Sequence, residues 1–180
     1  MAELSGPHWC ERFPTSREIS VLTVPFRDKV AKFVGALRAG NATVSIHATL
    51  RPKQRAYLMH YAFRIAQRHC TPGAVPPMHG VDIQWVHPNA AESIAAAARM
   101  VAEYAIVYEP ALQSRHSQGL AIDMDIAWNG DLAVKSASGG NIAIQTAPRT
   151  GMNPALWTLG AAYGVHKLAN DPPHWSSDGH

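Results

Sequence analysis

His116 and Asp123 are the first side chains in this sequence whose types and spacing suggest chemistry. His116 lies just before residues 120–128, in which apolar and polar residues alternate, and Gly119 permits a tight turn between the two. Alternation with period two predicts a strand, and Asp123 falls on its polar face. An imidazole nitrogen and a carboxylate oxygen held by a strand and a short turn can supply two ligands to a zinc ion.

A catalytic zinc site needs a third protein ligand and keeps its fourth position for water. His174 is the candidate, because Pro172 and Pro173 stiffen the chain before it and reduce the entropy lost when a ligand is fixed. Taken singly, a histidine or an aspartate in such a place is more typical of a solvated surface group. The prediction of a zinc site therefore depends on the three residues together.

Hydrophobic periodicity predicts the elements that position these residues. Helices are expected over 25–40, from Pro52 to about residue 65, over an alanine-rich stretch that ends near Tyr104, and over 153–164; strands are expected over 42–50, 105–108, 120–128 and 165–168, with a hairpin joining 132–136 to 141–146. Helices and strands follow one another in mixed order. This order predicts an α+β fold: a small antiparallel sheet flanked by helices, with the zinc site on the sheet.

Length and composition bound the class of protein. With 180 residues, 47% of them hydrophobic, we expect a single domain over 1–180, with an irregular N-terminal segment at 1–24 and a core from about residue 25 to 180. A net charge of +3 without a run of Lys or Arg gives no indication of nucleic-acid binding. No stretch is apolar enough to span a membrane, and residues 1–10 lack the pattern of a signal peptide. The redox state of Cys10 and Cys70 is left open.

The sequence resembles a known family in two motifs. Ser114, His116, Gly119, Ala121 and Asp123 match Ser-x-His-x-x-Gly-x-Ala-x-Asp, and Asp171, His174 and Trp175 match an acidic residue followed by x-x-His-Trp. Both are similar to the zinc D-Ala-D-Ala carboxypeptidase and L-alanyl-D-glutamate endopeptidase family, which includes phage endolysins and D-Ala-D-Ala dipeptidases. The resemblance covers residues 49–175 and implies a hedgehog/D-Ala-D-Ala-peptidase-like fold.

The resemblance also implies roles for single residues. His116, Asp123 and His174 would bind Zn²⁺, and Asp171 would be the general base. Many family members have glutamate where this chain has Asp171, so its backbone must lie nearer the metal or the activity must be weaker. Arg51, in Thr49-Leu50-Arg51-Pro52, would hold the scissile carbonyl oxygen as it becomes negative. The plainer alternatives are a turn-capping Asp171 and a surface Arg51.

Ser114 and Trp175 would bind substrate by the same resemblance, although Ser114 equally suits a role in the turn and Trp175 a place in the core. Asp125 shares a face with Asp123 and would orient a ligand histidine or be solvated.

The expected activity is hydrolysis of a stem-peptide bond in peptidoglycan. Two alternatives stay open: a non-catalytic zinc-binding module of the same fold, and a cytoplasmic D-Ala-D-Ala dipeptidase. A wall-cleaving protein without a signal peptide would be made in the cytoplasm and reach the wall by phage release or specialised secretion.

Overall fold

The computed structural model describes residues 2–180, and their contacts group them into two compact units. One, called here the sheet unit, comprises Ser16–Leu50 and Arg115–His180. The other, the helical unit, comprises the described residues up to Thr15 together with Arg51–Ser114. The expectation of a single domain over residues 1–180 stays a prediction.

Two helices of the sheet unit begin and end at the residues that their sequences predict. In α1 (Phe26–Ala39) the apolar residues recur at helical spacing, and all five of this stripe are buried: Phe26, Val30, Phe33, Val34 and Leu37. The helix α4 (Pro154–Tyr163) begins after Asn153, whose side chain accepts a hydrogen bond from the backbone of Ala155. It ends at Gly164, whose φ of 75° suits a residue without a Cβ.

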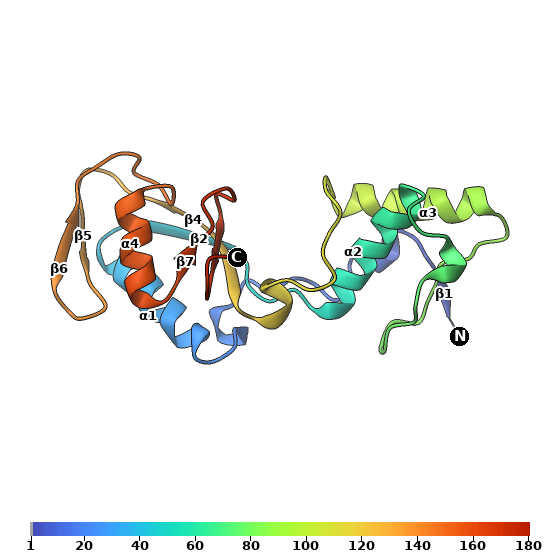
Figure 1. Cartoon of the computed structure of the whole chain (residues 1–180), viewed down its shortest axis with the longest axis horizontal. Coiled ribbons are helices and arrows are strands. Elements are labelled where there is room, and N and C mark those ends of the chain that lie inside the picture. Colours follow the sequence, from blue (N-terminus) through green and yellow to red (C-terminus); the bar gives the residue numbers. More distant parts are fainter. Residues whose placement is uncertain (1) are drawn as a thin grey trace. The chain divides into compact units, whose positions relative to one another are not determined.

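A four-stranded sheet lies beside these helices (Figure 1). Its order is β2-β4-β8-β7 and every pairing is antiparallel. The strands are β2 (Thr43–Ala48), β4 (Ala121–Ala127), β7 (His166–Lys167) and β8 (His174–Ser176). Ile122, Met124 and Ile126 of β4 are buried in one core with α1 and α4, so the alternate residues, Asp123 and Asp125, lie on the opposite face.

Two details of the sheet unit bear on the site. The register of β2 against β4 shifts between Ile46 and Ala48, so that Ala48 lies opposite Asp123. The predicted hairpin is formed by β5 (Leu132–Lys135) and β6 (Asn141–Ile144), which are paired antiparallel, and its apolar residues join the same core. The sheet unit thus presents a mainly polar sheet face opposite a closed apolar core.

The helical unit is built on α2 (Lys53–Ala66) and α3 (Ala90–Glu103), which pack together around an apolar core. A short parallel pair, β1 (Glu3–Leu4) and β3 (Ile83–Gln84), flanks them. Residues 1–24 were expected to be irregular, yet they contain β1, and Trp9 and Cys10 are buried in this core. A tryptophan with only 2% of its surface exposed contributes a large apolar area to the core.

The predicted strand over 105–108 is wrong. Ala105 has a φ of 52°, which belongs to the left-handed region and interrupts an extended chain, and Tyr108 is 84% exposed. The remaining elements confirm a mixed α/β architecture with small antiparallel sheets. Among residues 2–180, no helix combines the length and apolar character that crossing a bilayer requires.

Candidate metal centre

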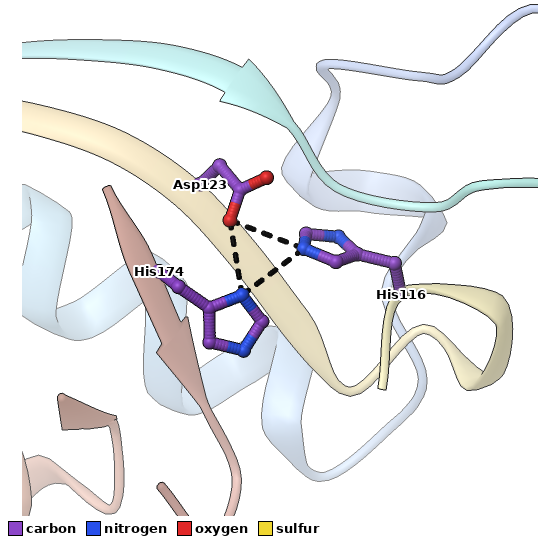
Figure 2. A group of neighbouring side chains, drawn as sticks. All are labelled: His116, Asp123 and His174. Atoms are coloured by element: carbon purple, nitrogen blue, oxygen red, sulfur yellow. Dashed lines mark hydrogen bonds and ion pairs between the residues drawn. The ribbon is translucent and has the colours of Figure 1, made fainter. Parts of the chain in front are cut away.

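Three side chains of the sheet unit converge on one point (Figure 2). The His116 Nε2 atom lies 3.1 Å from Asp123 Oδ1 and 3.3 Å from His174 Nδ1. His174 Nδ1 lies 3.1 Å from the same Asp123 oxygen. We call these three atoms the donor triangle. The structure thus brings together the three residues that the sequence predicted as metal ligands.

Each of the three residues is fixed by its element. His116 opens a single 3-10 turn, His116–Gln118, which ends at Gly119 with a φ of 68°. A Cβ at Gly119 would lie 2.8 Å from the Thr23 side-chain oxygen, so the close approach of Thr23 also requires glycine. Asp123 and His174 are direct partners across the antiparallel strands β4 and β8, and directly opposed side chains project to the same face.

Main-chain oxygens hold the outer nitrogen of each imidazole ring. His116 Nδ1 lies 2.8 Å from the Thr49 carbonyl oxygen, and His174 Nε2 lies 3.2 Å from the main-chain oxygen of His180. These oxygens can only accept, so each facing nitrogen must carry the hydrogen. In the neutral tautomers, the inner nitrogens then direct lone pairs at the Asp123 carboxylate. Such outer contacts orient metal-binding histidines in proteins.

Three acceptors that face one another require a positive charge between them. The pKa directions of Asp123 and His174 favour such a charge. Burial acts to raise the pKa of Asp123, but its hydrogen-bond and charge interactions with His116 and His174 outweigh it and hold that pKa well below its usual value. Burial acts to lower the pKa of His174, yet the hydrogen bond and charge of Asp123 raise it overall. Both directions favour a positive charge at the donor triangle.

The donor triangle also fits zinc by size and by chemistry. Zinc takes nitrogen and oxygen ligands at about 2.0–2.2 Å in tetrahedral geometry, which places neighbouring donors about 3.3–3.6 Å apart. The separations of 3.1, 3.3 and 3.1 Å lie at or slightly below the short end of that range. The two histidine side chains are 6% and 9% exposed and the Asp123 side chain 20% exposed, so water can reach the group on the Asp123 side. Two imidazoles and one carboxylate leave one tetrahedral position open.

Asp171 is exposed and lies in the turn between β7 and β8. Its backbone carbonyl accepts from the amide of His174 at 3.1 Å, so Asp171 and His174 move as one turn. The Lys167 ammonium group holds this turn by donating to the carbonyls of Leu168 (2.6 Å), Asp171 and His174 (3.1 Å). The general-base role of Asp171 stays a prediction, since the donor triangle itself does not include its carboxylate.

Arg51 and Ser114 belong to the helical unit, at two of the three points where the chain passes between the units. Both are half-buried and both interact with other residues. Their predicted roles, oxyanion stabilisation for Arg51 and substrate binding for Ser114, stay predictions.

The expectation that Trp175 binds substrate is corrected by the structure. Its side chain is 0% exposed and packs against Phe33, with ring centroids 5.5 Å apart. Neighbouring residues of a strand project to opposite faces, so His174 on the polar face places Trp175 in the core. A side chain without exposed surface cannot wall a cleft, and Trp175 instead anchors β8 beneath the donor triangle.

Asp125 does not orient a ligand histidine, because its carboxylate pairs with His47 at 2.8 Å, and both side chains are exposed. The outer partners of the ligand histidines are instead main-chain oxygens, those of Thr49 and His180. Sequence reasoning missed these two residues, and also Lys167. A backbone acceptor has no side-chain signature, so only a correct three-dimensional register could have revealed them.

Comparisons with known proteins give a likeness to a solved structure. No known family profile matches the sequence, and no curated protein matches it. Among solved structures, the chain is similar to a mutant of the vancomycin-resistance D,D-pentapeptidase VanY from a VanB-type cassette, in complex with Zn(II). The two share 14% identity, and the match covers 92% of this chain and 79% of that one, with a TM-score of 0.37. At that TM-score the likeness carries no argument about this chain.

Proposed function

We propose that this protein is a zinc-dependent peptidase that hydrolyses a stem-peptide bond of peptidoglycan. The observation that carries the zinc assignment is the donor triangle, with its tetrahedral spacing and both outer imidazole nitrogens held by main-chain acceptors. The substrate class is supported by the two sequence motifs, which resemble those of peptidoglycan peptidases. The hedgehog/D-Ala-D-Ala-peptidase-like fold is part of the same proposal.

A bound Zn²⁺ would supply a Lewis acid and would lower the pKa of water from about 16 towards 7. His116 and His174, held in fixed tautomers, and Asp123 would bind the ion. Asp171 would take the proton from the attacking water and pass it to the departing amine. Arg51 would stabilise the negative charge that develops on the carbonyl oxygen, and Ser114 would bind the substrate.

The turn over 168–174 is what makes Asp171 a suitable base in this proposal. A hydrogen bond from the His174 amide and the three carbonyl contacts of Lys167 fix the backbone from which the Asp171 side chain projects. Because the Asp171 side chain is one methylene shorter than glutamate, the proposal requires this backbone to lie closer to the ion than that of a glutamate would. Its exposure leaves the carboxylate accessible to water and to substrate.

One experiment tests metal dependence, activity and bond choice together. Purified protein is incubated with peptidoglycan, with and without a chelator, and the new chain ends are identified by mass spectrometry. We expect new peptide termini only without the chelator, and their restoration when Zn²⁺ is added back. Cleavage that continues undiminished in chelator would contradict the proposal.

The same assay separates the alternatives. A zinc-loaded protein that generates no new termini would indicate a non-catalytic zinc-binding module. Hydrolysis of free D-Ala-D-Ala without any cleavage of peptidoglycan would indicate a dipeptidase that acts in the cytoplasm. For the proposed activity, the protein would act on the wall after phage release or specialised secretion.

A further inference from the structure

An ion pair joins the two chain segments that carry the ligand histidines. Arg115 directly precedes His116, and Asp178 follows His174 by four residues. The guanidinium group donates from Nε to Asp178 Oδ1 at 3.1 Å and from Nη2 to Asp178 Oδ2. Its remaining amino group, Nη1, donates to Gln118 Oε1 at 2.8 Å and so ties Arg115 to its own turn. The forked contact fixes direction as well as distance, because both groups are planar.

The Asp178 end of this pair continues to the outer nitrogen of His174. Ser176, which is fully buried, accepts hydrogen bonds through Oγ from the amides of Gly179 (2.8 Å) and His180 (3.0 Å). Asp178 Oδ1 accepts from the His180 amide at 3.4 Å. This tight turn places the main-chain oxygen of His180 at 3.2 Å from His174 Nε2.

We infer that Arg115 and Asp178 are positioning residues that hold the His116 and His174 segments together and so preform the donor triangle; the inference rests on the metal site of the proposed function. The pair touches neither an inner nitrogen nor the Asp123 oxygen, so its effect passes through the turn at 176–180 and the turn at 116–118.

Because the pair is partly exposed, its effect on metal binding can be measured apart from its effect on the stability of the fold. The Arg115 and Asp178 side chains are 35% and 37% exposed. Ion pairs with this exposure usually contribute little to the stability of a fold. Removing the pair should therefore weaken metal binding while leaving the unfolding midpoint nearly unchanged. Removing an ion pair without a positioning role would leave the metal affinity unchanged as well.

The test measures the Zn²⁺ affinity of the full chain by competition with a chromogenic chelator. The variants are Arg115→Gln, Asp178→Asn, the double variant and Arg115→Lys. We expect each of the first two to weaken zinc binding about tenfold, the lower end of the range for residues that orient metal ligands. The double variant should lose no more than one single variant, and Arg115→Lys, which keeps the charge but not the fork, should recover only part of the affinity.

Arg27→Gln is the matched control. Arg27 pairs with Asp28 at 2.9 Å in the same unit, with side chains 42% and 54% exposed, and this ion pair joins two neighbouring residues of α1 rather than two segments of the site. Urea unfolding of every variant confirms that it is folded. Cobalt absorption, measured on the same proteins, reports whether the site keeps its tetrahedral geometry.

Zinc affinities equal to wild type in all Arg115 and Asp178 variants would overturn the inference and leave the proposed function standing. So would an equal loss in Arg27→Gln. A wild-type chain that binds zinc tightly but cleaves no peptidoglycan would defeat the proposed function, and the variant affinities would still judge the inference. A wild-type chain that binds no zinc would overturn both.

Discussion

Each unit of the protein contains a group of histidine and carboxylate side chains, and the two groups differ in how their atoms are placed. In the sheet unit, the donor triangle closes with edges of 3.1 to 3.3 Å. In the helical unit, Glu109 lies 3.8 Å from His60 and 3.9 Å from His69. Residue types alone would make the two groups equivalent candidates for a metal site.

The difference lies in which ring nitrogen is free to face the carboxylate. His60 Nδ1, the atom nearest to Glu109, is already within 2.7 Å of the Pro110 carbonyl. Arg64 brings a permanent positive charge to within 3.8 Å of Glu109, where it competes with any metal ion. The donor triangle instead has its outer nitrogens engaged and its inner ones directed at one point. Residue types therefore make both groups candidates for a metal site. The backbone acceptors distinguish them, because they set which ring nitrogens face the carboxylate.

The largest expected effect is on turnover, and it compares the proposed general base, Asp171, with Glu109 of the helical unit. Asp171→Asn should keep zinc and lose turnover by about 10²–10⁴-fold, because the neutral amide cannot accept the proton. The matched control, Glu109→Gln in the helical unit, should keep both. The measurement is the rate of appearance of new termini together with zinc content. Wild-type turnover in zinc-loaded Asp171→Asn would remove the base assignment.

The next effect tests the metal assignment itself. Asp123→Ala should weaken zinc binding by more than about 100-fold, beyond the loss typical of removing an outer hydrogen-bond partner, and should abolish cleavage as well. Glu109→Ala should bind zinc as the wild type does. Chelator competition measures both affinities. If Glu109→Ala lost the ion and Asp123→Ala retained it, the assignment of the two groups would be reversed.

A smaller effect is expected on the free energy of unfolding when Lys167 or Arg64, which both donate hydrogen bonds to main-chain oxygens, is replaced. Lys167→Met removes the donor shared by three carbonyls of the turn over 168–174, and should lower the free energy of unfolding by about 1–3 kcal/mol. Arg64→Met removes one hydrogen bond to a carbonyl, that of His69 at 3.2 Å, and should cost about 0.5–1.5 kcal/mol. Urea unfolding of the metal-free proteins measures both. A larger loss for Arg64→Met would contradict this ranking.

The smallest expected effect concerns the stability contribution of Glu109. Glu109→Gln should change the free energy of unfolding by less than about 0.5 kcal/mol, because the Glu109 side chain is 40% exposed and its partners lie beyond hydrogen-bond distance. The same urea experiment checks this value. A loss of several kcal/mol would show that the Glu109 group is a buried network rather than a loose surface cluster.

The sequence predicted much of the fold because its signals there are local. The five apolar residues of α1 are all buried, and the alternation over 120–128 became β4. The spacing of His116 and Asp123, together with His174, was enough to indicate the three members of the donor triangle. In the helix and in the strand, apolar residues recur at one regular spacing along a continuous segment, so the pattern can be recognised in the sequence.

What the sequence could not predict depends on pairing between distant segments. The strand β8 has three residues and follows two prolines, so it offers too few residues to show a period. The resemblance implied that Trp175 binds substrate, but its face depends on the register of β8 against β4, which the sequence does not show. The oxygens of Thr49 and His180 are backbone atoms, which every residue has. The left-handed backbone at Ala105 likewise has no signature in its side chain.

Because Asp123 and His174 are direct partners, an ion bound by both would fix the register of β8 against β4. A slip of β8 by a single residue would turn His174 into the core and Trp175 out into water, so only one alignment of this three-residue strand can bind. The free energy of ion binding would then stabilise that alignment and no other. With an ion bound, the amides of β8 should exchange their hydrogens more slowly than without it.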